Sequence, residues 1–134
     1  MSQSDLIWID VVSDVVCPWC FIGARRLQEA LTLCADIKTS VRWRPFQLDP
    51  TLPAEGMDRA SYMASKFPPE RIAEIHHHLE KLGAELGIDF AFDKITRSPN
   101  TMNAHRLICW SYAQGTQSAL VAALFQAYFV QGRD

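Results

Sequence analysis

The sequence predicts an α/β protein in which one strand–helix–strand unit is followed by a series of helices. Residues 6–12 are almost continuously apolar and residues 41–46 alternate, as strands do, while a helical pattern spans about residues 17–34 between them. After this unit, apolar residues recur mainly at helical spacing. We therefore expect a βαβ unit over residues 1–49 and a helical domain over residues 50–134.

The composition is that of an ordinary globular domain. The chain has 134 residues, of which 49% are hydrophobic and 21% are charged, which is enough for one domain with a core. The net charge of -2 gives no indication of binding to nucleic acid or to an anionic membrane surface. No apolar stretch approaches the length of a membrane span, and residues 1–5 lack the basic start of a signal peptide. We expect a cytoplasmic protein, or one whose leader has been removed.

The first strand and helix place two cysteines in different settings. Because residues 6–12 are nearly continuous in apolar side chains, we expect a strand buried on both faces. In the helix after it, an apolar stripe runs from Cys20 to Cys34 in steps of four and three residues. The stripe puts Cys20 on the buried face and leaves Cys17 at the exposed end. Cys20 and Cys34 would lie about 21 Å apart along the helix axis, too far for a disulfide.

The remainder of the chain is expected to consist of a loop and helices. Pro45 cannot donate to a strand ladder, so it marks an edge or the end of the second strand. Residues 49–56 contain two prolines and a glycine, which is typical of a loop. Four helices are expected after it: about 58–66; about 70–86, with Gly87 as C-cap; one from the cluster at 98–101 to near Gly115; and one from Thr116 to near Gly132.

Cys17-Pro18-Trp19-Cys20 is the strongest functional signal in the sequence. It follows a strand and opens a helix, where unpaired N–H groups and the helix dipole stabilise a thiolate, so Cys17 is the candidate nucleophile. Cys20 lies one turn further on and is the candidate resolving thiol. Pro18 suits the first turn because no N–H is needed there. Trp19 supplies an apolar surface beside the sulfurs that suits binding of an unfolded chain.

A zinc site and inert or structural cysteines are the alternative interpretations of this motif. Zinc requires two more ligands at suitable spacing, and the sequence has no second CxxC and no matching Cys/His pair. His76, His77 and His78 are adjacent, so on a helix they point about 100° apart. We expect them on a solvated or half-buried helix face, with no metal and no cofactor bound.

The other cysteines and most tryptophans are expected to be structural. Free cysteine is among the most commonly buried residues, so Cys34 and Cys109 are predicted to be core thiols. Trp8, Trp43 and Trp110 are predicted to be packing residues.

The run from Ile9 to Gly23, which contains CPWC, closely resembles the DsbA-type thioredoxin-fold oxidoreductases, in particular their FrnE-like branch. Three later segments resemble the family in the same order: residues 43–50, 100–107 and 124–134. The resemblance covers essentially the whole chain, and CPWC is its most specific part.

This resemblance implies a thioredoxin-like βαβ half, residues 5–48, followed by most of an α-helical insertion, residues 50–134. Members of the family continue with an antiparallel strand pair, a final helix and a cis-proline that faces the cysteines and contacts the substrate peptide. The sequence reaches Asp134 before any of these, so we expect the C-terminal strands of the thioredoxin fold to be absent from this chain. Open sheet edges would favour association, and the simplest expectation is a homodimer through the incomplete sheet.

The leading functional hypothesis is a thiol–disulfide oxidoreductase that acts on protein or small-molecule thiols and disulfides through Cys17 and Cys20. Phe46, Asn100 and His105 lie in the matching segments and are candidate substrate-binding residues, although helix capping also accounts for Asn100. Glutathione is a candidate thiol substrate.

Two other hypotheses remain open. One is a glutathione-using enzyme similar to the kappa-class transferases and the 2-hydroxychromene-2-carboxylate isomerases. Those enzymes typically carry serine at the position of Cys17 and lack the second cysteine, so CPWC argues against them. The other is a non-catalytic fragment that binds a partner chain through its exposed sheet edge.

Overall fold

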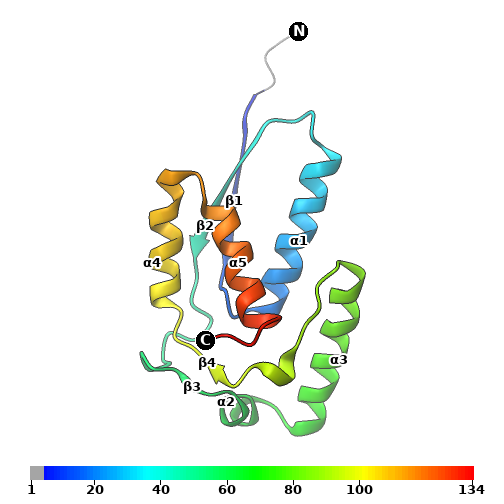
Figure 1. Ribbon diagram of the computed structural model, residues 1–134, viewed down its shortest axis with the longest axis vertical. Helices are drawn as coiled ribbons and strands as arrows, with labels where there is room; N and C mark the ends of the chain where they lie inside the picture. The colour runs from blue at the N-terminus through cyan, green and yellow to red at the C-terminus, as the bar shows by residue number, and fades with distance from the viewer. Residues whose placement is uncertain (1–4) are drawn as a thin grey trace.

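The computed structural model describes residues 5–134 of the chain. It begins with the expected unit of β1 (Ile7–Ser13), α1 (Pro18–Leu33) and β2 (Thr39–Pro45). The two strands are parallel, with Ile7 opposite Thr39 and Ser13 opposite Pro45. Figure 1 shows α1 running beside them. The βαβ prediction is confirmed, and β2 ends at Pro45 as its missing N–H donor requires.

The later part of the chain is mainly helical, as predicted. The predicted glycine stops are present: Gly87 follows its helix at a φ of 72°, and Gly132 follows the last helix at a φ of 66°. At Gly132 a Cβ atom would lie 2.5 Å from the carbonyl oxygen of Lys94, so only glycine fits this turn. The helices among residues 5–134 that follow the loop are α2 (Arg59–Lys66), α3 (Pro69–Glu85), α4 (Met102–Ser111) and α5 (Gln117–Phe129), with short 3-10 turns η1 (Phe92–Lys94) and η2 (Tyr112–Gln114).

A small second sheet departs from the expectation that only helices follow the loop. Here β3 (Met57–Asp58) pairs in antiparallel fashion with β4 (Arg97–Ser98). Each strand has two residues, which is too short to leave an alternating pattern in the sequence. The pairing matters because it joins the start of α2 to the segment that precedes α4.

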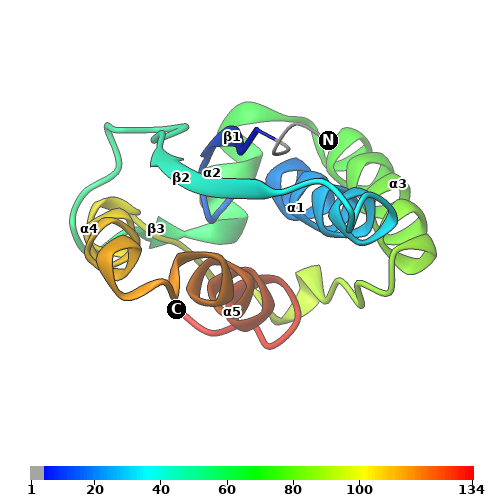
Figure 2. The ribbon, with the colours of Figure 1, turned by 90° about the horizontal axis from the view of Figure 1, so that it is seen from above.

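A cluster of aromatic rings forms the hydrophobic core. Phe125 and Phe129 of α5 are 0% exposed. The ring of Phe21 in α1 stacks on Phe125 with centroids 5.0 Å apart, and Phe90 meets both Phe21 and Phe129 edge-on. Figure 2 shows α1 and α5 between α3 at one end and α4 at the other. Residues from both predicted ranges, 1–49 and 50–134, therefore contribute to one core.

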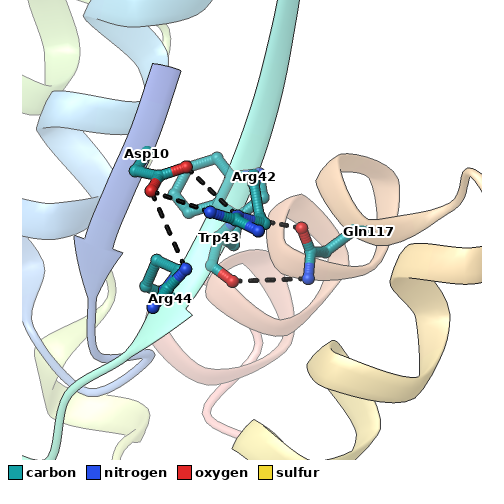
Figure 3. Close-up of polar contacts among 5 residues, drawn as sticks. All are labelled: Asp10, Arg42, Trp43, Arg44 and Gln117. Atoms are coloured by element: carbon teal, nitrogen blue, oxygen red, sulfur yellow. Dashed lines mark hydrogen bonds and ion pairs between the residues drawn. The ribbon is translucent and has the colours of Figure 1, made fainter. Parts of the chain in front are cut away.

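The outer edge of β2 is covered by the start of α5. The Gln117 side chain accepts a hydrogen bond from the Trp43 N–H (2.8 Å) and donates one to the Trp43 carbonyl (3.4 Å), as Figure 3 shows. The Trp43 indole N–H donates to Ser118 at 2.9 Å. Gln117 thus satisfies two buried backbone groups that a neighbouring strand would otherwise pair. Trp43 is 7% exposed, so its predicted packing role is confirmed.

The face of β1 that turns away from the hydrophobic core is exposed within residues 5–134. Trp8 is 65% and Val12 63% exposed, and Asp10 between them accepts two hydrogen bonds from Arg42 and lies 3.8 Å from Arg44 (Figure 3). Hydrogen bonding to Arg42 lowers the pKa of Asp10. The prediction that β1 is buried on both faces is wrong, because an apolar run cannot show whether a second layer covers it. Trp8 is not a packing residue here, and the homo-oligomer stays a prediction.

The predictions for two cysteines and a third tryptophan are also wrong. Cys34 and Cys109 are exposed, and Trp110 is 70% exposed. Cys34 is the C-cap of α1 and lies beyond the part of the helix that the core covers. Cys109 and Trp110 lie on α4 next to the buried Ile108, but on faces that turn outward. Both thiols are therefore available to reagents that attack exposed cysteine.

The helices of residues 5–134 include none that combines the length and the apolar character needed to cross a membrane.

We expect Phe129→Ala to lower the free energy of unfolding by about 3–5 kcal/mol, because it opens a cavity inside the aromatic cluster. Urea unfolding followed by circular dichroism measures the change. Leu33→Ala removes a large side chain that is 86% exposed, and it serves as the control, with an expected effect within about 0.5 kcal/mol. Equal effects of the two substitutions would contradict the assignment of the core.

Candidate active site

The CPWC motif lies at the junction of β1 and α1, as the sequence predicts. Cys17 is the N-cap of α1, and its Sγ accepts a hydrogen bond from the Cys20 N–H at 3.3 Å. Pro18 occupies the first helical position, where no N–H donor is needed. The first helical turn therefore directs a backbone donor at the Cys17 sulfur, which favours negative charge there.

The two thiols are both half-buried, so the expected contrast between an exposed Cys17 and a buried Cys20 is weaker than predicted. They differ in access: Cys17 lines the cavity described below, and Cys20 is not among its lining residues. A bound molecule therefore meets the Cys17 sulfur first.

Hydrogen bonding between the two side chains moves their pKa values apart. The thiol that keeps its proton donates a hydrogen bond to the thiolate. With the charge on Cys20, this bond lowers the pKa of Cys20 to about 6 and raises the pKa of Cys17. The first proton thus leaves the pair more readily than a free thiol loses its proton, and the remaining one is shared. We assign the reacting charge to Cys17, because the shared proton moves between the sulfurs and Cys17 is the one that faces the cavity.

A buried carboxylate lies directly before the motif. Asp14 is 2% exposed, and its backbone oxygen accepts the Cys17 N–H at 3.1 Å. One carboxylate oxygen accepts the Leu48 N–H at 2.9 Å, and the other lies 3.0 Å from Nε2 of His105. Asp14 was not identified from the sequence. In the sequence, Asp14 is distinguished only as an acidic residue between the predicted strand and the CPWC motif.

His105, a predicted substrate-binding residue, lies in the interior behind the motif. It is 5% exposed, and Nε2 is 3.0 Å from both Asp14 and the carbonyl oxygen of Phe46. Both partners are acceptors, so we assign the ring hydrogen to Nε2. The structure thus gives His105 a role in holding Asp14 and the loop after β2. The Phe46 side chain is 53% exposed and stays a candidate for substrate contact.

Asn100 connects the start of α4 to the same loop. Its Oδ1 accepts the Met102 N–H at 2.9 Å and faces Nε2 of Gln47 at 3.4 Å, while its Nδ2 donates to the Leu52 carbonyl at 2.8 Å. The first of these contacts is an Asx turn just before α4; the N-cap itself is Thr101, which has no side-chain capping bond, so Asn100 is not the cap that the sequence suggests. The segments around residues 46–52 and 100–107 are therefore in contact beside the motif.

A cavity of about 740 Å³ opens beside Cys17. Its lining includes Pro18 and Trp19 of the motif and residues of α2 and α3. Trp19 is 49% exposed, and its ring lies 5.8 Å from the ring of His78. The apolar side chains of the lining from α2 and α3 are Met63, Phe67, Ile75 and Leu79. Sequence patterns did not reveal this cavity, since its walls come from segments far apart in the chain.

The three adjacent histidines diverge on α3, as predicted. His76 is half-buried and stacks on Phe92 with centroids 4.3 Å apart, whereas His77 and His78 are exposed. The described part of the chain, residues 5–134, has no group of three His, Cys, Asp or Glu side chains placed to hold a metal ion.

Comparison with known proteins agrees with the fold and the motif. The model of the DsbA-like thioredoxin domain matches residues 8–134. This chain belongs to the DsbA-like thioredoxin-domain family. The α/β class and the thioredoxin-like fold expected from the sequence are thus confirmed. The match is to the family as a whole, so the FrnE-like branch stays a prediction.

Two individual proteins match over nearly all of this chain. The uncharacterized protein YwbO of Bacillus subtilis is 25% identical over 128 residues, which are 96% of this chain and 59% of that protein. The crystal structure of a probable DsbA oxidoreductase from Streptomyces coelicolor matches with a TM-score of 0.82 and 25% identity, covering 96% of this chain and 56% of the other.

A more distant structure agrees in fold alone. It is a putative protein disulfide isomerase from Nitrosomonas europaea, with a TM-score of 0.60 and 18% identity, covering 98% of this chain and 58% of the other. In all three comparisons, this chain spans less than two thirds of its relative's length.

We expect His105→Leu to destabilise the protein by about 1–3 kcal/mol, because a buried carboxylate and a carbonyl lose their shared donor. Urea unfolding measures the loss. Arg106→Ala, at the adjacent exposed position, is the control and has an expected effect within about 0.5 kcal/mol. If His105→Leu keeps full stability but loses disulfide exchange, His105 contacts substrate and the structural role is wrong.

We expect the pH dependence of Cys17 alkylation to report the hydrogen bond from Cys20. The thiolate is the reacting form, so the rate is present above the pKa and is lost as the pH falls through it, and the hydrogen bond between the two sulfurs lowers the pH at which the pair loses its first proton. Cys20→Ala removes the donor and moves the midpoint up toward about 8.5, the ordinary thiol value. Cys20→Ser keeps a donor and gives an intermediate midpoint.

The measurement is iodoacetamide labelling of Cys17, followed by peptide mass mapping across pH. The background is Cys34→Ser and Cys109→Ser, because both of those thiols are exposed. A midpoint that does not change in Cys20→Ala would refute the coupling of the two sulfurs.

Proposed function

We propose that this protein is a thiol–disulfide oxidoreductase that exchanges disulfides with protein or small-molecule partners through Cys17 and Cys20. The observation that carries the proposal is the position of Cys17 Sγ, which is the N-cap atom of α1 and lines the large cavity. Membership of the DsbA-like family supports an oxidoreductase role. Cys20 follows one helical turn later, which suits a resolving thiol.

The exchange proceeds in two displacements at sulfur. The Cys17 thiolate attacks one sulfur of the substrate disulfide, so a mixed disulfide forms and the first substrate half leaves as a thiolate. Cys20 then loses its proton to solvent and attacks Cys17 Sγ, which releases the second half as a thiolate. The dithiol gives two electrons to the substrate and ends as the Cys17–Cys20 disulfide. The reverse sequence oxidises a substrate dithiol, and the relative reduction potentials set the direction.

The neighbours of the sulfurs support this use. Pro18 fixes the first turn of α1, so the cysteines stay at a set separation. Trp19 is half-exposed beside Cys17 and offers an apolar surface to a bound chain or small molecule. We propose Phe46 as a further contact, because its exposed ring belongs to the same loop as Leu48, which lines the cavity.

We expect Cys17→Ser to reduce insulin-reduction activity with dithiothreitol to the uncatalysed rate, because the nucleophile is lost. Cys20→Ser leaves the first displacement intact but removes the resolving step. This variant accumulates a mixed disulfide with glutathione when glutathione disulfide is added, and intact mass shows the adduct. Peptide mapping assigns the adduct to Cys17.

The double variant Cys34→Ser/Cys109→Ser is the matched control, because it removes two exposed thiols outside the motif. It is expected to keep the wild-type rate. Equal rates for wild type and Cys17→Ser would reject the oxidoreductase proposal, and a folded protein without activity would favour a binding role.

A further inference from the structure

The polar side chains that line the cavity beside Cys17 include Arg59, His76, Ser98 and Tyr128, which lie close together. Nη1 of Arg59 donates to the Tyr128 hydroxyl at 3.3 Å, and that hydroxyl donates to the Arg97 carbonyl at 2.9 Å. The Ser98 side chain is next to the Tyr128 hydroxyl, and Arg59 is close enough to His76 to lower its pKa. We call these four residues the polar cluster.

Two members of the polar cluster have buried atoms without a partner. Ser98 is 4% exposed, and its Oγ lies beside the Tyr128 hydroxyl but makes no hydrogen bond of normal geometry among residues 5–134. Nε2 of His76 is also buried and unpaired within the same residues. Buried polar atoms are nearly always hydrogen-bonded in proteins, so these two atoms, in residues of one cavity lining, leave hydrogen-bonding capacity free for water or a bound molecule.

The polar cluster also carries a positive charge that is not balanced. Arg59 forms no ion pair within residues 5–134. Two other cations of the cavity lining are each balanced: Arg71 lies 2.8 Å from Glu74, and Lys66 lies 3.8 Å from Asp49. Burial is the largest cause of the lowered pKa of His76, so its ring is neutral near pH 7 and adds no second charge.

The type of ligand follows from these groups. A planar guanidinium suits a carboxylate, which accepts two parallel N–H bonds from it. The Ser98 hydroxyl and the His76 ring add neutral donors, which matches a single negative charge. Trp19, Phe67 and Ile75 line the same cavity, so the body of the ligand is apolar. The volume of about 740 Å³ is that of a site for a small organic molecule.

We propose that the cavity binds small apolar or aromatic disulfides that carry a carboxylate, with the carboxylate held by Arg59, Ser98 and His76 and the disulfide presented to Cys17. This inference rests on the proposed oxidoreductase function and names a substrate class for it. The polar cluster positions the substrate and takes no part in the sulfur chemistry.

The dithiol alone supplies the two electrons that reduce such a substrate. The Cys17 thiolate attacks the nearer sulfur, forms the mixed disulfide and releases one carboxylate-bearing thiolate. Cys20 displaces the second thiolate from Cys17 Sγ, and its proton goes to solvent. The substrate gains two electrons, and the cysteines lose two in forming their disulfide.

The test compares two aromatic disulfides, dithiobis(nitrobenzoate), which carries carboxylates, and dithiodipyridine, which is uncharged near pH 7. Second-order rate constants are measured with reduced protein in the Cys34→Ser/Cys109→Ser background, so that the exposed thiols do not contribute. The readout is the ratio of the two rate constants, which cancels any change in the reactivity of the Cys17 thiolate.

We expect Arg59→Gln to lower this ratio by about tenfold, the effect of losing one hydrogen bond to a charged group. Ser98→Ala lowers it severalfold and needs no rearrangement of the fold, so it tests the inference even if Arg59→Gln fails to fold. Arg26→Gln makes the same change in net charge at an exposed residue of α1 that is not part of the cavity lining. Its ratio is expected to stay within about twofold of the parent, as for an exposed charge far from the bound molecule.

The outcomes separate the two proposals. If Cys17 reacts with both reagents and neither Arg59→Gln nor Ser98→Ala changes the ratio, the carboxylate site is wrong and the oxidoreductase function stands. If Arg59→Gln and Arg26→Gln lower the ratio equally, the preference reflects the net charge of the protein, and the carboxylate site is again wrong. If Cys17 reacts with neither reagent faster than a free thiol, the proposed function fails and the substrate class fails with it.

Discussion

The buried carboxylate of Asp14 is the group on which the geometry of the site depends. A charge removed from water is costly unless donors surround it. The donors come from Leu48 and His105, which lie 34 and 91 residues away in the sequence. Asp14 also accepts the Cys17 N–H through its backbone oxygen. The turn that carries the reactive sulfur is therefore fixed only when the loop after β2 and helix α4 are in place.

The same contacts build one wall of the cavity. The loop that donates to Asp14 through Leu48 is held a second time by Asn100, which binds the Leu52 carbonyl, and a third time by the Tyr62 hydroxyl on Asp49. Leu48 and Leu52 both line the cavity. A substitution that loosens the Asp14 contacts would therefore disturb both the cysteine turn and the binding surface. The cysteine turn and the cavity wall thus depend on the same set of contacts.

Local features of the site could be predicted from the sequence, and features that depend on distant neighbours could not. Cys17 as N-cap and Gly87 after α3 are set by residues within one turn, so their pattern is visible in the chain. Whether an apolar side chain is covered depends on elements elsewhere, so Trp8 and Trp110 were predicted to pack and are exposed. The cavity and the role of Asp14 have the same non-local origin, and neither has a periodic signature.

Because neighbouring residues set the cysteine turn and distant ones set the cavity, the CPWC motif indicates the type of reaction but not the substrate. The backbone contacts of Cys17 are with Asp14, Cys20 and Phe21, all within four residues, so the sulfur chemistry is encoded locally. Much of the cavity lining comes from α2 and α3. Changes in those helices can alter which molecule is held at Cys17 while the dipole and the N–H donors at the start of α1 stay the same. Under the proposed function, substrate choice is therefore open to change independently of the thiolate, and Arg59 and Ser98 are the residues in which we propose to look for it.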